Sequence, residues 1–591
     1  GLLFAFIYFY EWQTQRDPSP SATIVPGFKP VQVQAIQVRP PGPSKLEIRA
    51  ERTNSFWWLT EPMIYPGQSA SIEALIQAIQ ALAPAAHISP AELRARPNAD
   101  EEYGFSSPQA GSVILTTGSN RIHLLLGIKT APGDQLFLQV VGREGVYVVD
   151  ADLLKLVPRS VDDWRDTRLL NLRALAFNRL TVKHGPNVFE LQRDSQAALW
   201  RMLRPYQARA NHAKIEQALE RLNDLQVKTF ISDASALDLE PFGLHQPELE
   251  LSFLGQGGST GAGLDTNVLS VLQFGKSPTN DPSAVFARVP SHGTIVTVPK
   301  DALASWRASV YDFRDPHLIS VTQPIGSIVV RGTESFMLER HTNAWRVMPE
   351  NLPADTALVE EFLGALTSLR IAQFVKDAVI ESDLPTYGLA PPARQYILQT
   401  QTAGPTGSNA VELNFGFSTN ANGTVFARCA GESFVYGVST SEFERLPRAG
   451  WQLRDRNLCR ATEQDVARVT VRQQGRTREL LRKGSHDWSL APGSQGIIDD
   501  LAIEETVRGL LRAGAVTWVA CGESCRNQFG FVDSKYELAV SLHTGPALTI
   551  QFGGEAPSGN VYAGTVLDGQ FRVLEFSWLV YRDLVTYLSA P

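Results

Sequence analysis

Two short motifs in the sequence are typical of catalytic or phosphate-binding sites. Residues 257–261 read Gly-Gly-Ser-Thr-Gly, the pattern of a nucleophile elbow, in which the serine must lie on a turn from a strand into a helix. Here 28 residues separate Pro247 from Gly275, against 19 between Pro108 and Gly127 in a corresponding stretch. The motif therefore lies in a glycine-rich insertion between two strands, and we interpret it as a hairpin loop.

Gly275-Lys276-Ser277 matches the end of a phosphate-binding loop. The first glycine of that loop would stand at position 270, which is Ser270, and no glycine-rich loop opening a helix follows. We interpret Gly275 as the end of a strand.

Metal and acid–base chemistry have no better candidates. The ten histidines are scattered, and none has another His or a Cys at metal-ligand spacing. The acidic pairs Asp162-Asp163, Glu360-Glu361 and Asp499-Asp500 fall at expected helix starts or in linkers, where solvation or the helix dipole accounts for them. We predict no catalytic residue, no cofactor, no metal site and hence no enzyme.

The four cysteines do not form a disulfide framework. Cys521 and Cys525 are close enough to pair in an oxidising compartment, and we predict a disulfide there, with two free thiols as the alternative. Cys429 and Cys459 are interpreted as buried free thiols.

The composition is that of an ordinary globular protein. The 591 residues are 43% apolar and 19% charged, and the net charge of -7 gives no reason to expect nucleic acid as a partner. At about 150 residues per domain, this length suggests roughly four domains.

The N-terminus differs from the rest. Residues 1–10, GLLFAFIYFY, are apolar or aromatic, but a spanning helix needs about 20 such residues. We interpret residues 1–12 as the end of an N-terminal transmembrane helix, with Trp12 in the interfacial aromatic belt, and residues 13–30 as a Pro-rich linker. A cleaved signal sequence or a buried core segment are the alternatives.

Five landmarks recur in the same order along the chain, four of them three or four times and one of them twice. A Trp followed by Pro recurs at spacings of 142, 145 and 143 residues, and an aromatic-Gly-apolar triplet recurs with it. A strand-ending Gly, a Val-Phe-Ala-Arg run and a bulky residue before Arg-Asp complete the set. The positions are Trp58, Trp200, Trp345 and Trp488; Gly104, Gly243, Gly388 and Gly530; Gly127, Gly275, Gly416 and Gly553; Val285 and Val425; Arg165-Asp166, Arg314-Asp315, Arg454-Asp455 and, as an echo in the last copy, Arg582-Asp583.

These landmarks predict four tandem homologous α+β domains. Each is expected to run strand, strand, amphipathic helix, four strands and a short helix, with helices on one face of an antiparallel-leaning sheet. The predicted domains are 31–172, 173–319, 320–461 and a shortened, divergent 462–591. We expect each Trp to be buried against the following helix, the triplet Gly to take a positive φ, and Arg-Asp to close one unit against the next.

The landmark order resembles a bacterial family of unassigned function. The clearest pieces are Trp345-Arg346-Val347-Met348-Pro349, Tyr387-Gly388-Leu389-Ala390-Pro391-Pro392, Val435-Tyr436-Gly437-Val438 and Arg454-Asp455, and the resemblance covers about residues 31–591. Its members typically carry an N-terminal transmembrane helix and are encoded beside ABC-2-type permeases and gliding-motility-type auxiliary components of ABC transporters. The resemblance carries no catalytic residues.

It implies a non-enzymatic subunit on the periplasmic side of the bacterial inner membrane. The expected role is that of an accessory or scaffold subunit of an ABC-type export system, with the permease, the ATPase or the auxiliary component as partners. The alternative is a periplasmic ligand-binding or hydrolytic protein with a site at a domain junction.

Overall fold

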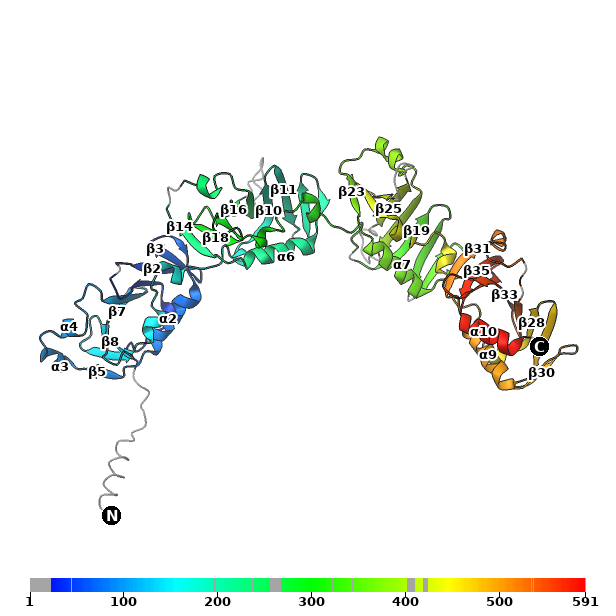
Figure 1. The fold of residues 1–591 in the computed structure, drawn as a ribbon, viewed down its shortest axis with the longest axis horizontal. Coiled ribbons are helices and arrows are strands. Elements are labelled where there is room, and N and C mark those ends of the chain that lie inside the picture. The colour runs from blue at the N-terminus through cyan, green and yellow to red at the C-terminus, as the bar shows by residue number, and fades with distance from the viewer. Residues whose placement is uncertain are drawn as a thin grey trace, which may run out of the picture. The chain divides into compact units, whose positions relative to one another are not determined.

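The computed structural model describes residues 23–589 apart from 44, 195–197, 235–237, 256–266, 322, 343, 401–409, 418–423, 533 and 535. The chain divides into two compact units, Gly1–Asp315 and Pro316–Pro591, each containing two antiparallel sheets (Figure 1). The expected transmembrane segment, residues 1–12, and the Gly-Gly-Ser-Thr-Gly motif lie outside the described residues. Among the helices of the described part, none is long and apolar enough to cross a membrane.

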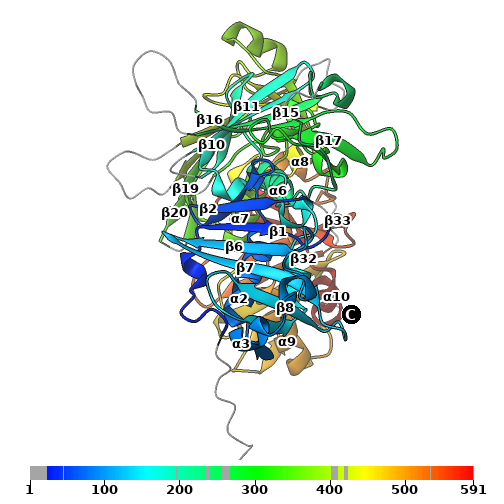
Figure 2. The same ribbon diagram turned by 90° about the vertical axis from the view of Figure 1, so that its left-hand side faces the viewer.

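The first repeat is a nine-stranded sheet with one long helix. Its strand order is β4-β3-β2-β1-β6-β7-β8-β9-β5, and Figure 2 shows β2, β1, β6 and β7 side by side. The elements are β1 (Ala35–Arg39), β2 (Ile48–Thr53), β3 (Phe56–Glu61), β4 (Tyr65–Pro66), α2 (Ser69–Ala81), β5 (Ala86–Ile88), α3 (Pro90–Arg94), α4 (Ala99–Glu102), β6 (Gly111–Thr117), β7 (Asn120–Lys129), β8 (Gln135–Val140), β9 (Val146–Asp150) and α5 (Leu153–Leu156).

The second and third repeats have the same strand order. The second contains β10 (Phe177–His184), β11 (Asn187–Arg193), β12 (Trp200–Arg204), β13 (Ala208–Arg209), α6 (His212–Asn223), β14 (Thr229–Ser232), η4 (Glu240–Phe242), β15 (Leu249–Gly255), β16 (Val268–Phe274), β17 (Ala284–Arg288), β18 (Ile295–Pro299) and η5 (Asp301–Leu303). The third contains β19 (Ile325–Arg331), β20 (Phe336–His341), β21 (Ala344–Met348), β22 (Leu352–Pro353), α7 (Thr356–Ser368), β23 (Gln373–Lys376), β24 (Arg394–Thr400), β25 (Ala410–Phe417), β26 (Thr424–Cys429), β27 (Val435–Ser439) and α8 (Thr440–Glu444).

The fourth repeat has eight strands in its sheet and ends in a helix. Its elements are β28 (Val466–Gln473), β29 (Arg476–Arg482), β30 (Trp488–Leu490), α9 (Asp500–Arg512), β31 (Thr517–Cys521), η10 (Glu523–Cys525), β32 (Tyr536–Leu542), β33 (Leu548–Glu555), β34 (Val561–Leu567), β35 (Gln570–Phe576) and α10 (Trp578–Leu588). The repeated fold is therefore α+β and mostly β, as the landmark pattern predicted in outline.

The long helix of each repeat packs on one face of its sheet. In α2 the buried positions are Ile72, Leu75, Ile76 and Ile79, three and four residues apart, so one stripe of the helix faces the sheet. In repeats 1, 3 and 4 a smaller apolar cluster lies around the aromatic-Gly triplet and includes Tyr103, Leu389 and Phe531.

Two details differ from the predicted unit. Three strands and a two-residue fourth precede α2, because residues 48–61 form a hairpin that turns at Asn54 and Ser55, both with positive φ. Ile24, Val25 and Phe28, which were assigned to a linker, are buried in the first core. The Ile24 N–H donates to the Leu82 carbonyl at 2.9 Å, so this segment is part of the first fold.

Candidate functional site

The landmark tryptophans are buried beside a glutamate of the following helix. Trp200, Trp345 and Trp488 are at most 5% exposed, as predicted. In the first repeat the buried residue is Trp57, at 1% exposure, and not Trp58. Side chains alternate between the two faces of β3, so only one of two adjacent tryptophans can face the core.

Each indole N–H is followed sixteen residues later by a carboxylate. Trp200 Nε1 donates to Glu216 Oε1 at 2.8 Å, and Trp488 Nε1 donates to Glu504 Oε2 at 3.0 Å. Trp57 makes the same bond to Glu73 at 3.3 Å, and Glu361 has the same spacing from Trp345. Sequence reasoning missed this pair, although the constant spacing could have shown it.

An arginine completes the arrangement and is most enclosed in the fourth repeat. Arg482 lies 4.5 Å from the Trp488 ring and forms an ion pair of 2.8 Å with Glu504, both side chains being at most 5% exposed. Arg52 and Arg193 pair with Glu73 and Glu216 in the first two repeats. Because the set recurs in successive folds and its members pair with one another, it stabilises the strand–helix packing.

The glycine landmarks form a second repeated contact. The triplet glycines Gly104, Gly243, Gly388 and Gly530 have φ between 66° and 82°, which confirms the predicted positive φ. A Cβ on the strand-ending Gly127 would overlap the Tyr103 carbonyl oxygen, which accepts a hydrogen bond of 3.0 Å from the Ile128 N–H. The strand glycine is thus required for the triplet to approach the sheet.

The Arg-Asp landmark links neighbouring repeats within each unit, as predicted. Arg165 is 2% exposed and pairs with Asp233 of the second repeat, while its guanidinium lies 4.5 Å from the Phe230 ring. Arg454 pairs with Asp568 of the fourth repeat, and its carbonyl accepts from Trp518 Nε1 at 3.2 Å.

The expected fourth Arg-Asp is wrong. Arg582 and Asp583 lie in α10, exposed and paired with each other at 2.9 Å. The three residues Tyr581-Arg582-Asp583 match the landmark in residue type but not in spacing, and so short a match does not identify a linker.

The residues after Arg165 bind both neighbours through the backbone. The Asp166 N–H donates to the Pro66 carbonyl at 2.9 Å, and three residues further on the Leu169 N–H donates to the Leu225 carbonyl at 3.0 Å. The Val227 N–H donates back to Thr167 at 2.6 Å. The short connection is therefore hydrogen-bonded to the first repeat on one side and to the second on the other.

A histidine and three aromatic rings fill the same junction. His292 of the second repeat lies 5.8 Å from Trp58 and 5.6 Å from Tyr65, and Tyr65 lies 5.6 Å from Phe230. Burial lowers the pKa of His292, and burial raises the pKa of Tyr65 well above its usual range, although Arg165 opposes that rise. Trp58 thus serves this contact between repeats.

The other candidate residues are accounted for locally. Asp499 is the N-cap of α9 and accepts from the Ala502 N–H at 3.0 Å, whereas Glu360 and Glu361 lie inside α7 and not at its start. Among the described residues, no group of three or more His, Cys, Asp and Glu side chains could hold a metal ion. No helix follows Gly275-Lys276-Ser277, and Gly275 directly follows β16.

The cysteines are free thiols in this structure. Cys521 Sγ lies 3.2 Å from Gln570 Oε1 and 3.2 Å from Arg572 Nη1, and Cys525 Sγ donates to the Cys521 carbonyl at 3.5 Å. Cys429 is buried, as interpreted from the sequence, and Cys459 is half-buried. The Cys521–Cys525 disulfide stays a prediction.

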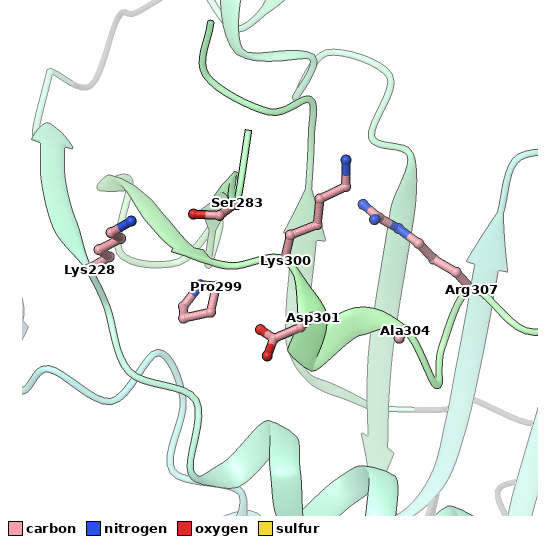
Figure 3. A pocket seen from close by; sticks show the side chains of 7 residues that line it. All are labelled: Lys228, Ser283, Pro299, Lys300, Asp301, Ala304 and Arg307. Atoms are coloured by element: carbon pink, nitrogen blue, oxygen red, sulfur yellow. The ribbon is translucent and has the colours of Figure 1, made fainter. Parts of the chain in front are cut away.

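The second repeat contains an open pocket of about 840 Å³ (Figure 3). Three of its lining residues are cationic and one is acidic; the lining is Lys228, Ser283, Pro299, Lys300, Asp301, Ala304 and Arg307. Lys228 forms an ion pair with Asp281, and Arg307 pairs with Glu248 at 3.3 Å. Lys300 Nζ donates to Ser277 Oγ at 3.2 Å. Sequence reasoning missed this pocket because its residues are spread over 80 positions.

Comparison with known proteins gives one family. The profile of the domain of unknown function DUF4340 matches residues 57–198, 200–348 and 345–525. Each match begins at one of the buried tryptophans, Trp57, Trp200 or Trp345. No curated protein and no solved structure matches the chain. Because the three matches cover most of its length, the chain belongs to the DUF4340 family and carries that domain as a tandem repeat.

Proposed function

We propose that this protein is a non-enzymatic, membrane-anchored accessory or scaffold subunit of a larger inner-membrane assembly, an ABC-type export system of the gliding-motility kind. Residues 1–12 would supply the anchor, and the repeats would lie in the periplasm. The permease and the ATPase would be separate subunits that bind the repeats.

The linker at residues 165–169 carries the proposal. Its two sides are hydrogen-bonded to successive repeats, and the buried Arg165 crosses between them. A connection of this kind keeps two domains in a fixed relation, whereas a protein whose domains close around a substrate needs a hinge there. Tandem repeats that do not move against each other present a continuous surface, which repeat proteins use for binding.

The repeated side-chain sets also support a structural role for the repeats. The Trp–Glu–Arg set, the glycine contact and the Arg-Asp linker each have partners within the fold, so they need no ligand to explain them. The transport connection itself rests on the resemblance to proteins encoded beside ABC-2 transporters.

Purification of the native complex tests this role. Affinity-tagged protein is expected to co-purify from detergent-solubilised membranes with an ABC permease, an ATPase or an auxiliary component, identified by mass spectrometry. Chain lacking residues 1–12 should leave the membrane fraction. The proposal fails if the native protein is isolated alone under mild detergent and the purified protein turns over a substrate.

A further inference from the structure

We propose that the pocket of the second repeat, which Lys228 also lines, binds a phosphate-type oxyanion through Lys300 and Arg307. This goes beyond the scaffold role, because a scaffold of equivalent repeats needs no pocket in one of them.

At the positions of these three cations, the repeats compared below carry uncharged residues. The Lys228 N–H donates to the Thr297 carbonyl just ahead of an edge strand. The same bond is made in the other repeats by Ala85, Ala372 and Val516. An uncharged side chain therefore suffices for the fold at this position.

The other two cations are replaced in the same way. Lys300 directly follows β18, and residues Ala151 and Thr440 follow the matching strands β9 and β27. Arg307 stands six residues before Phe313, and the residues six before Trp164 and Leu453 are Pro158 and Pro447.

Lys300 and Arg307 both line the pocket. Figure 3 shows the Lys300 ammonium and the Arg307 guanidinium converging on the same side of the pocket, with the Asp301 carboxylate directed away from them. Two like charges that line one pocket repel each other, and a bound anion would offset that repulsion. Arginine and lysine together are the usual protein ligands of phosphate.

The described carboxylates near the pocket pair with Lys228 and Arg307 but not with Lys300. Asp281 is occupied by Lys228 and by the Ser283 hydroxyl at 2.6 Å, and these hydrogen bonds lower the pKa of Asp281. Glu248 holds Arg307 through one nitrogen, while Arg307 Nε is buried without a hydrogen-bond partner. Lys300 has a hydroxyl partner and, within the described part of the chain, no ion pair with a carboxylate.

Titration calorimetry of the full-length protein at low ionic strength tests the site. Inorganic phosphate is expected to bind saturably, and the dissociation constant should rise with added sodium chloride. A second titration with glycerol phosphate distinguishes a free ion from a phosphorylated headgroup, since only a site open to an organic phosphate will bind both with similar affinity.

Two variants and one control assign the binding to this pocket. Lys300→Gln and Arg307→Gln should each weaken phosphate binding at least about tenfold, or about 1.4 kcal/mol. Lys300→Arg should retain it, and Lys183→Gln, at an exposed position on β10, should not change it. Unchanged melting of each variant excludes unfolding as the cause. Absence of saturable binding, or equal loss in Lys183→Gln, overturns the proposal.

Discussion

Replacing Arg165 by alanine should loosen the junction between the first two repeats. The side chain is 3% exposed and makes an ion pair with Asp233, a second one with Asp162 at 3.2 Å, and ring contacts with Phe230 and Tyr65. The variant would leave Asp233 without its counter-charge.

The size of the effect follows from the exposure of the partners. Removing one member of a fully buried ion pair costs about 3–5 kcal/mol. Asp233 is 33% exposed and also accepts from the Thr294 hydroxyl at 2.9 Å, so its remaining charge is partly solvated. The Asp162 pair is at the surface and contributes at most about 1 kcal/mol, whereas the ring contacts add about 1–2 kcal/mol. We expect a loss of about 2–4 kcal/mol in the free energy of opening this junction.

Native-state hydrogen exchange measures that opening directly. The Leu169 and Val227 amides bond across the linker, so their protection should fall about 30- to 900-fold in Arg165→Ala, at 1.36 kcal/mol per factor of ten. Arg168→Ala is the control, because Arg168 is 43% exposed and pairs only with Asp166 among the ion pairs described. Equal protection in the wild type and Arg165→Ala, or equal loss in both variants, would refute the assignment of Arg165 as the residue that holds the repeats together.

Four further predictions concern single contacts. Trp488→Phe should destabilise the fourth repeat by about 1.5–3 kcal/mol in hydrogen exchange of α9, because Glu504 loses a buried donor, while Trp578→Phe, at 47% exposure, should be neutral. Gly416→Ala should destabilise the third repeat by about 1–3 kcal/mol in denaturant unfolding, since its Cβ would overlap two carbonyl oxygens, whereas Gly364→Ala, with open space in α7, should stabilise it by up to about 1 kcal/mol. Burial lowers the folded-state pKa of His292 below its ordinary 6.5, so the unfolded state takes up the proton first and stability is lost as pH falls below 6.5. The protection factors of amides at the first junction, which are corrected for the intrinsic pH dependence of exchange, should therefore fall below pH 6.5, and His292→Phe should remove this fall. Mass spectrometry of non-reduced protein from an oxidising compartment should show a Cys521–Cys525 disulfide, and quantitative alkylation of both thiols would contradict it.

The repeated outline of the fold was accessible from the sequence because its landmarks are residues with strict steric demands. A positive φ at Gly388 or a buried ring at Trp345 tolerates few substitutions, so the same residue type recurs at nearly constant spacing. The amphipathic stripe of α2 was equally clear, because a long helix displays its period over several turns.

The details that could not be predicted depend on contacts without a local signal. The edge strand β5 has only three residues, and its pairing with β9 involves residues some 60 positions apart. The choice of Trp57 over Trp58 depends on which face of β3 meets the helix, which a hairpin turn sets upstream. The pocket could not be predicted from the sequence for the same reason. Its cations Lys228, Lys300 and Arg307 share no motif and line one pocket only because β14 pairs with β18.

Comparing the four copies separates residues needed for the fold from residues available for function. The glutamate sixteen residues after each tryptophan is present in every copy, so it belongs to the fold whatever the protein binds. The same comparison shows that the fold does not require a lysine at position 228. The equivalent backbone bond is made in the other repeats by Ala85, Ala372 and Val516. The backbone bond alone does not require a lysine at that position, where the ammonium instead pairs with Asp281 at an entropic cost to the side chain. Lys228 and Arg307 have carboxylate partners within the second repeat, whereas Lys300 has only a hydroxyl partner among the described residues, so Lys300 is the cation that the proposed oxyanion site would explain.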